Sequence, residues 1–369
     1  MTLSAVDTIH LRVPLDEPIP ASVARPLTEN LSIHLVRLTF DDGSASWGEA
    51  WCDDAAAVGE AVELLRPILL DTDPLDRGAL WERMVDRLTG QKEPLEGGAP
   101  ALSAIDVALW DAFGRSLGLP VWQLLGGKRM ARLDAYATGI YLEEPDVAAR
   151  KARAMLQSGF HALKIKAGAD VARSVEVLEA VRAVIGPQVP LMVDANQAYE
   201  DRDAAMEFGA AVDRAEVFWY EEPMPPEDWT NYVTLRNALD TPIAGGERLR
   251  SPGAFLRAFA AGALDVAMPD VRLCGGITGL LKIADLARWY NVQISPHNWA
   301  SQIGAIASSH AAVTLPNCLM TEVERTRTPA SEHLLEQPLR FEDGFVVIPD
   351  GPGLGIAVSD DFVSEHKVQ

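Results

Sequence analysis

Apolar and polar residues alternate over positions 9–13, as they do in a strand with one buried face. Two similar segments, 32–39 and 46–50, flank the sequence Asp-Asp-Gly at 41–43, and this arrangement predicts a hairpin. Segment 16–30 contains three prolines and shows no period, so we expect a loop there. The chain is therefore predicted to begin with a small antiparallel sheet.

The pattern then becomes helical, first over 56–70 and 101–117. From about residue 133 onward, short apolar segments alternate with amphipathic helices such as 174–185. We predict eight strands in this part, at 133–141, 162–166, 191–194, 217–221, 243–246, 266–269, 293–296 and 318–322.

Strand, helix and strand at intervals of roughly 25 residues indicate parallel βαβ units, and eight such units favour a closed barrel. The last unit is less regular, so seven full units and a weaker eighth are the alternative. The strand-like and turn-rich tail at 341–356 is expected to fold back on the N-terminal domain. We predict an α/β fold with an N-terminal α+β domain at 1–127, a (β/α) barrel at 128–328 and a returning segment at 329–369.

Composition limits the possible partners. The formal net charge of −21 argues against nucleic acid or an anionic membrane as a partner, because both favour Lys and Arg. The N-terminus lacks a signal-peptide pattern, and the chain has no apolar stretch of about 20 residues. Three scattered cysteines do not suggest disulfides or a zinc site, so we expect a cytoplasmic protein.

Ionisable residues stand at the ends of seven successive predicted strands. In chain order they are Lys166, Asp194, Glu221, Glu247, Asp270, His297 and Glu322. Barrel active sites are built at the C-terminal ends of the strands, so these groups are expected to meet at one mouth. A solvated surface would not produce this regular placement.

Each of these groups has a structural and a functional interpretation. Lys164 and Lys166 share one face of their strand; alone they are as readily a solvated pair, but in a barrel mouth their pKa would fall and one could act as a base. A single acid is usually a helix cap, but three converging carboxylates, Asp194, Glu221 and Glu247, would need a cation such as Mg²⁺.

Asp270 could orient His297 through a hydrogen bond to one ring nitrogen, although His297 could also be a satisfied core histidine.

Taken together, several stretches resemble the enolase superfamily, and within it the mandelate racemase-like group. They are ALKIKAG (162–168), VDANQAY (193–199), WYEEP (219–223), GGE (245–247), MPDVRLCGGIT (268–278) and SPHNW (295–299), with SAIDVALWDAFGRSLGLPVWQLLGG (103–127) and PDGPGLGI (349–356). The resemblance covers nearly the whole chain. It implies a modified (β/α)8 barrel under an N-terminal α+β capping domain that the C-terminal tail completes.

The resemblance also implies roles for the residues at the mouth. Mg²⁺ would bind Asp194, Glu221 and Glu247. Lys166 would act as a base on one face of the substrate, with Lys164 near its carboxylate. The Asp270–His297 dyad would serve the other face.

Three further roles follow from the resemblance. Protonated Glu322 would donate to a carboxylate oxygen, with Glu324 as the alternative for that position. Asn196 would contact the substrate or the metal shell. The sixth strand carries no lysine, and this disfavours muconate cycloisomerase-like, succinylbenzoate synthase-like and dipeptide epimerase-like chemistry.

The implied reaction removes the proton next to a carboxylate and forms an enediolate. Dehydration of a sugar acid to a 2-keto-3-deoxy acid is the favoured outcome, with racemisation or epimerisation of a 2-hydroxy acid as the alternative. A barrel that binds a sugar acid without converting it is a third. We also expect a homo-oligomer.

Specificity is expected from two polar loops of the capping domain, 16–30 and 49–58. Their candidate substrate contacts are Ser22, Arg25, Thr28, Glu29, Trp51, Asp53 and Asp54, of which Arg25 and Trp51 are favoured. This polar mixture favours a sugar acid over an aromatic substrate.

Overall fold

The computed structural model describes residues 1–22, 26–226, 228–299 and 301–368. Its N-terminal part is an antiparallel sheet of order β1-β2-β3, formed by Leu3–Ile19, Thr28–Phe40 and Ala45–Ala50. The prediction of a loop over 16–30 was therefore too wide, because Ile19 pairs with Thr28. β1 lies at the edge of the sheet, where the missing N–H of proline costs little.

Helices of this part contact the sheet directly or through one another. They are α1 (Ala55–Leu69), η1 (Pro74–Asp76), α2 (Arg77–Thr89), α3 (Gly98–Leu117) and α4 (Val121–Leu124). Apolar residues of β1–β3 and α1–α3 form a core of their own, separate from the barrel core. No helix among the described residues is long and apolar enough to span a membrane.

The second part is a barrel of eight parallel strands, as the sequence predicts. The strands are β4 (Leu133–Ile140), β5 (Leu163–Lys166), β6 (Leu191–Asp194), β7 (Trp219–Glu221), β8 (Ile243–Gly245), β9 (Val266–Ala267), β10 (Gln293–Ile294) and β11 (Thr321–Glu324). β11 pairs with β4, and a single bridge between Ile294 and Cys318 closes the ring. The last strand thus begins later than predicted.

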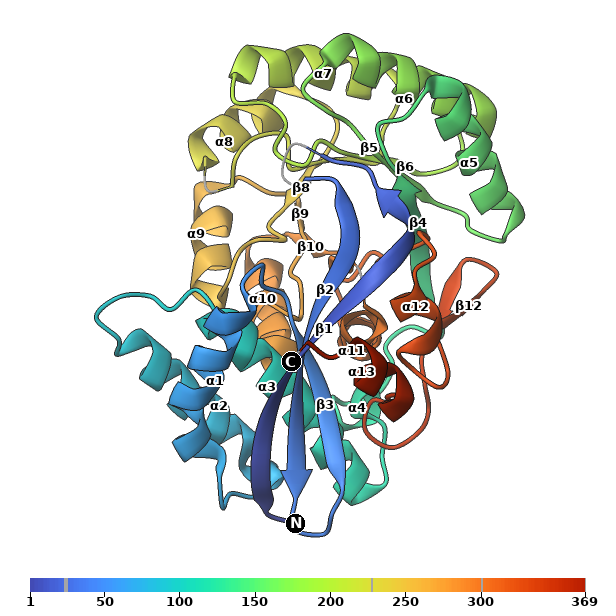
Figure 1. The fold of residues 1–369 in the computed structure, drawn as a ribbon. Helices are drawn as coiled ribbons and strands as arrows, with labels where there is room; N and C mark the ends of the chain where they lie inside the picture. Colours follow the sequence, from blue (N-terminus) through green and yellow to red (C-terminus); the bar gives the residue numbers. More distant parts are fainter. Residues whose placement is uncertain (23–25, 227, 300, 369) are drawn as a thin grey trace.

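Helices surround the barrel, as Figure 1 shows. They are α5 (Pro145–Gln157), α6 (Val171–Ile185), α7 (Arg202–Arg214), α8 (Trp229–Ala238), α9 (Pro252–Ala261), α10 (Gly276–Trp289), α11 (Gln302–Ala312) and α12 (Pro329–His333). Aspartate or serine side chains cap the N-termini of α6–α9 and α11, which fixes where each loop ends. The short α12 confirms that the eighth unit is weaker.

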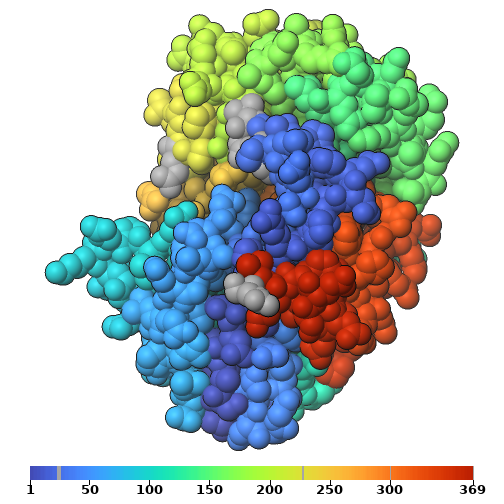
Figure 2. Space-filling model, viewed as in Figure 1, coloured from blue at the N-terminus to red at the C-terminus, as the bar shows by residue number. Residues whose placement is uncertain are grey.

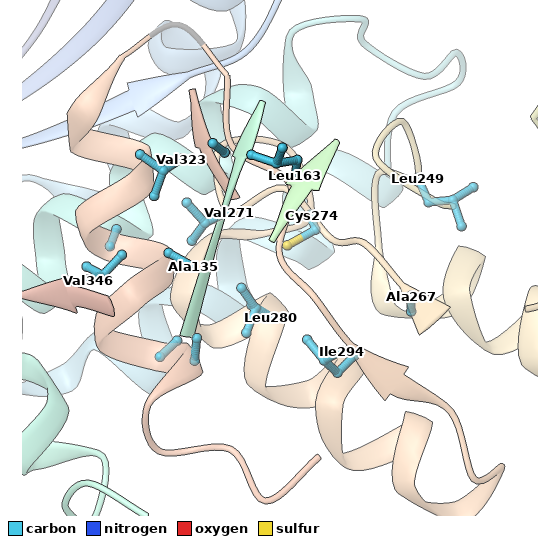
Figure 3. Packing of buried hydrophobic residues seen from close by; sticks show 14 of the residues in the cluster. Ala135, Leu163, Leu249, Ala267, Val271, Cys274, Leu280, Ile294, Val323 and Val346 are labelled. Carbon is cyan, nitrogen blue, oxygen red and sulfur yellow. The ribbon is translucent and has the colours of Figure 1, made fainter. Parts of the chain in front are cut away.

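Buried apolar residues tie strands to helices in the barrel. Figure 3 shows this packing, with Leu163 of β5, Ile294 of β10 and Leu280 of α10 in one cluster. Inside the ring, Tyr136, Met192 and Trp219 form a smaller cluster below the mouth. The barrel is therefore filled except at its C-terminal end.

The C-terminal tail contacts the barrel first and then the capping domain, so the predicted return of residues 341–356 to the N-terminal domain holds only for the later part of that segment. β12 (Arg340–Glu342) and β13 (Phe345–Val347) form a hairpin beside β4, and α13 (Asp360–His366) lies beside β1. Gly353 has a φ of 70°, and a side chain there would meet Oδ1 of Asp111, which accepts from the Leu354 N–H at 2.8 Å. Figure 2 shows the blue N-terminal residues between the green and yellow barrel helices and the red tail.

Candidate active site

Three buried carboxylates converge at the barrel mouth. Asp194 ends β6, Glu221 ends β7 and Glu247 lies two residues after β8. One oxygen of each lies within 4.8 Å of the others. Burial acts to raise the pKa of Asp194, but Lys166 and Lys164 outweigh it and lower that pKa to about 2. Burial and the charge of Asp194 raise the pKa of Glu221 to about 8.

This cluster, the carboxylate triad, fits a hard cation. Oε2 of Glu247 is buried without a hydrogen-bond partner among the described residues, although Nε2 of His297 lies 3.2 Å away. A buried anionic oxygen without a partner is costly. Three such carboxylates supply the oxygen ligands that a divalent cation prefers, so the triad could hold a metal ion.

The two lysines of β5 lie against the triad. Nζ of Lys164 is fully buried and lies 2.9 Å from Glu221 and 2.8 Å from Glu322, while Lys166 pairs with Asp194. Burial acts to lower the pKa of both lysines, but the neighbouring carboxylates outweigh it and both pKa values lie above their ordinary value. The expected lowering of the pKa of these lysines is therefore not found.

The histidine lies after β10, with its ring between two acids. Nδ1 of His297 lies 2.7 Å from Oδ2 of Asp270, and Nε2 faces Glu247. Burial acts to lower the pKa of His297, but Glu247 and Asp270 raise it to about 9. Trp51 of the capping domain stacks on the imidazole, with ring centroids 5.2 Å apart.

The two acids of β11 differ in position. Glu322 is buried, accepts from the Asn298 N–H at 3.1 Å and pairs with Lys164. Burial acts to raise its pKa, but Lys164 and His297 hold the pKa of Glu322 below its ordinary value, so the expectation that it is protonated is not met. Glu324 accepts from the Thr326 N–H and does not line the cavity, which favours Glu322 for the role at the mouth.

A cavity of about 470 Å³ opens above these groups. The residues predicted at the site that line it are Lys166, Asn196, Glu247, His297, Glu322, Ser22, Thr28, Trp51 and Asp53. Glu29 does not line it, and Asp54 caps α1 instead. Arg25 lies outside the described residues.

Asn196 connects the barrel to the capping domain. Its N–H donates to Asp194 at 2.7 Å, and its Oδ1 accepts from the Ser22 hydroxyl at 2.6 Å. The loop after β6, whose backbone N–H binds the triad carboxylate Asp194, is therefore in contact with a capping segment that faces the cavity.

The sequence analysis missed several residues that line the cavity: Thr138, Tyr141, Arg248, Arg272 and Trp299. Two of them had a signal, because Arg248 directly follows Glu247 and Arg272 lies two residues after Asp270. Thr138 lies near the end of β4 and Tyr141 directly follows it, and this strand end carries no acid, lysine, arginine or histidine. For these two residues the sequence held no comparable signal.

Two protein-family models match the chain. The N-terminal domain of mandelate racemase / muconate lactonizing enzyme matches residues 5–126, and the enolase C-terminal domain-like model matches residues 147–362.

Individual relatives agree with these matches. D-galactarolactone cycloisomerase of Agrobacterium fabrum is 36% identical, with 100% of this chain and 99% of the relative covered. Arabinonate dehydratase of Saccharolobus solfataricus is 29% identical, with 91% of each covered. A crystal structure described as a racemase from Streptomyces coelicolor A3(2) with bound magnesium has a TM-score of 0.90 and 29% identity, with 99% of this chain and 100% of that chain covered.

Proposed function

Because the chain belongs to the mandelate racemase / muconate lactonizing enzyme family of the enolase superfamily, we propose that it removes the proton next to the carboxylate of a sugar acid. In this proposal the oxygen on the neighbouring carbon then leaves, and the product is a 2-keto-3-deoxy acid. The reaction is a dehydration when that oxygen departs as water.

The observation that carries this proposal is the placement of two candidate bases around the carboxylate triad. Lys166 comes from β5 and His297 follows β10, and β6–β9 separate these strands on one side of the ring. Both side chains line the cavity. A substrate carboxylate held near the triad would place its α-carbon between a lysine and a histidine, as general-base catalysis on either face requires.

Below the triad, Lys164 and Glu322 face the place where negative charge would develop. Lys164 is fully buried and cationic, and it already contacts Glu221 and Glu322. A fixed positive charge in a site that excludes water stabilises an enediolate far more than it would in solution. We therefore assign Lys164 to charge stabilisation and Glu322 to holding Lys164 in place.

Mg²⁺ is the metal we propose for Asp194, Glu221 and Glu247. Three carboxylates leave positions for water and substrate, which suits Mg²⁺. Once bound, the ion would neutralise charge on the substrate carboxylate and make its α-proton more acidic. Its charge would also oppose the carboxylates that hold the pKa of Lys166 and His297 high. The structural relative with bound magnesium supports this choice.

The polarity of the cavity supports a sugar acid. Ser22, Thr28, Asn30 and Ser32 of the capping domain line it and offer hydroxyl and amide groups to a polyol. One of the two candidate bases, His297 or Lys166, would lie on the same side of the substrate as the leaving oxygen. If that residue is protonated, it can donate its proton to the oxygen as the oxygen departs. The similarity to an arabinonate dehydratase supports dehydration.

A second candidate reaction opens a ring. If the departing oxygen belongs to a lactone or anhydro ring, the same proton abstraction breaks the ring and the product is an isomer of the substrate. The 36% identity to a D-galactarolactone cycloisomerase favours this variant. Return of the proton on the opposite face would instead racemise or epimerise the substrate.

A library of five- and six-carbon aldonates, aldarates and their lactones tests the proposal. With Mg²⁺ present, we expect at least one member to give a 2-keto acid, measured with a carbonyl reagent and by mass. Mass lower by one water indicates dehydration, and unchanged mass indicates ring opening. EDTA should abolish turnover and Mg²⁺ should restore it. If no member loses or exchanges its α-proton with Mg²⁺ present, the proposal is wrong.

A further inference from the structure

The carboxylate that orients His297 is itself held by an arginine. Oδ1 of Asp270 accepts from the backbone N–H and from Nε of Arg272, at 2.8 and 2.9 Å. Oδ2 accepts from Nη2 of Arg272 at 2.6 Å and lies 2.7 Å from Nδ1 of His297. This two-point contact fixes the plane of the carboxylate, and therefore fixes the direction in which the imidazole lies.

The arginine is in turn tied to the capping domain. Nη1 of Arg272 lies 3.2 Å from Glu49 at the end of β3 and donates to the Trp299 carbonyl at 2.5 Å. The other oxygen of Glu49 accepts from the Gly304 N–H at 3.3 Å. Arg272 and Glu49 are both 3% exposed in their side chains, so this pair is shielded from solvent. Breaking one partner of a buried pair leaves an uncompensated charge and is costly.

The same strand end also touches the imidazole itself. Trp51, two residues after Glu49, stacks on His297. The backbone N–H of Trp51 donates to the Arg272 carbonyl at 3.3 Å. The end of β3 therefore holds His297 in position in two ways. Trp51 stacks on its ring, and Glu49 acts through Arg272 and Asp270.

The lysine side of the cavity is built differently. Among the described residues, the ion-pair partners of Lys164 and Lys166 all lie on barrel strands β6, β7 and β11. A change in the contact between β3 and the barrel would therefore displace His297 and leave Lys166 in place.

We propose that Arg272 and Glu49 are positioning residues for His297, through which the end of β3 controls one of the two bases and not the other. The inference rests on the proposed function. A base must lie within hydrogen-bond reach of the proton it removes, so a small rotation of Asp270 would slow only the half-reaction that uses His297.

The test measures α-proton exchange in D₂O with Mg²⁺ for two sugar acids of the library that differ only at the α-carbon. His297→Asn and Lys166→Ala first establish which base acts on which epimer. Glu49→Gln keeps the shape of the side chain and removes its charge. Arg272→Lys keeps a charge and loses the two-point contact with Asp270.

We expect Glu49→Gln and Arg272→Lys to lower the kcat of His297-dependent exchange about 10- to 100-fold, the size of effect seen for residues that orient a metal-bound histidine. KM and Lys166-dependent exchange should stay within about threefold of wild type, because the lysine side is untouched. Arg115→Lys is the matched control. Arg115 also pairs with a buried aspartate, Asp111, but lies in the contact between α3 and the tail.

Equal loss for both epimers would show a general structural role and overturn the inference, and so would wild-type exchange with both. Should Arg272→Lys fail to fold, Glu49→Gln alone decides between these outcomes. Exchange by wild type with neither epimer, nor with any member of the library, would instead contradict the proposed function itself.

Discussion

Buried ionisable groups gather in two regions of this molecule, the barrel mouth and the contacts of α3 and α11 with α10 and the tail. At the mouth, the carboxylate triad brings three negative charges within 4.8 Å of one another. In the second region, which we call the cap–tail joint (buried Asp106, Asp111 and His310, with the exposed Arg115), each buried group contacts a neutral or oppositely charged partner. Burial alone therefore does not distinguish a reactive site.

The cap–tail joint shows what a structural group needs. Asp106 accepts from the N–H and hydroxyl of Thr278, at 2.9 and 2.6 Å, although burial still raises its pKa to about 7. Asp111 accepts from Arg115 at 2.9 Å and from the Leu354 N–H. Asp106 and Asp111 each accept hydrogen bonds from their own donors, and neither has another carboxylate among its hydrogen-bond contacts.

The mouth lacks this balance. Oε2 of Glu247 has no hydrogen-bond donor in the described structure, and the charge of Asp194 adds to burial in raising the pKa of Glu221. Lys164, Lys166 and His297 offset part of this negative charge, but three carboxylates so close together still repel one another, and such an arrangement sacrifices stability for chemistry. Convergence of like charges, more than burial, separates the functional region from the structural one.

The largest expected effect comes from a triad residue. Glu247→Gln should lower turnover at least about 1,000-fold, because one ligand of the ion that neutralises the substrate carboxylate is lost. The metal-free variant should unfold at the same or a higher temperature than metal-free wild type, since one of three repelling charges is gone. Steady-state kinetics and thermal melts with EDTA measure both. If Glu247→Gln kept its activity but lost stability, Glu247 would behave like a structural residue, and the contrast between the barrel mouth and the cap–tail joint would be wrong.

The opposite result is expected at the cap–tail joint. Asp111→Ala should lower the free energy of unfolding by about 3 kcal/mol, because Arg115 and the Leu354 N–H lose a buried acceptor. Turnover per folded molecule should match wild type. Urea titration measures the stability. The control is Glu144→Ala, which removes an exposed partner of Arg173 and should cost under about 1 kcal/mol.

A smaller effect, visible in pH dependence, is expected from His310. Its ring lies between the Trp122 N–H and the Leu354 carbonyl, and burial lowers its pKa to about 4, below the ordinary value of 6.5. The unfolded chain therefore binds this proton more readily, and stability is lost as pH falls from 6.5 toward 4.

Between pH 7 and pH 5 this loss should be about 2 kcal/mol. In His310→Gln this part of the pH dependence should disappear, and urea titrations at the two pH values measure the difference. His333→Gln, which changes an exposed histidine, is the control and should follow wild type. A variant that loses as much stability as wild type on acidification would contradict the assignment.

The sequence was sufficient where function follows strand order. Ionisable residues at successive strand ends must meet in a parallel barrel, so Asp194, Glu221 and His297 could be brought together without coordinates. The direction in which the pKa of Lys164 and Lys166 shifts could not be predicted in the same way. Their pKa depends on which carboxylate lies nearest, and that is a matter of side-chain distance.

Contacts between the capping domain and the barrel could not be predicted from the sequence either. Glu49 and Arg272 are 223 residues apart in the chain, and neither position has a local pattern that predicts the other. The extension of β1 and β2 into the two ends of the predicted loop had a similar cause, because the pairing of Ile19 with Thr28 overrides the local effect of the prolines. Local periodicity predicts elements, and tertiary contacts decide how far they extend.

The central claim is that the groups at the mouth form a metal-dependent site with two bases. The most direct test follows α-proton exchange in D₂O by NMR for two sugar acids of opposite configuration at the α-carbon, with wild type, Lys166→Ala and His297→Asn. Both side chains contact the carboxylate triad, but neither substitution replaces one of its three residues. We predict that each variant loses exchange with one epimer and keeps it with the other, and that EDTA stops both. Loss of exchange with both epimers in each variant, while Mg²⁺ and substrate still bind, would contradict the account.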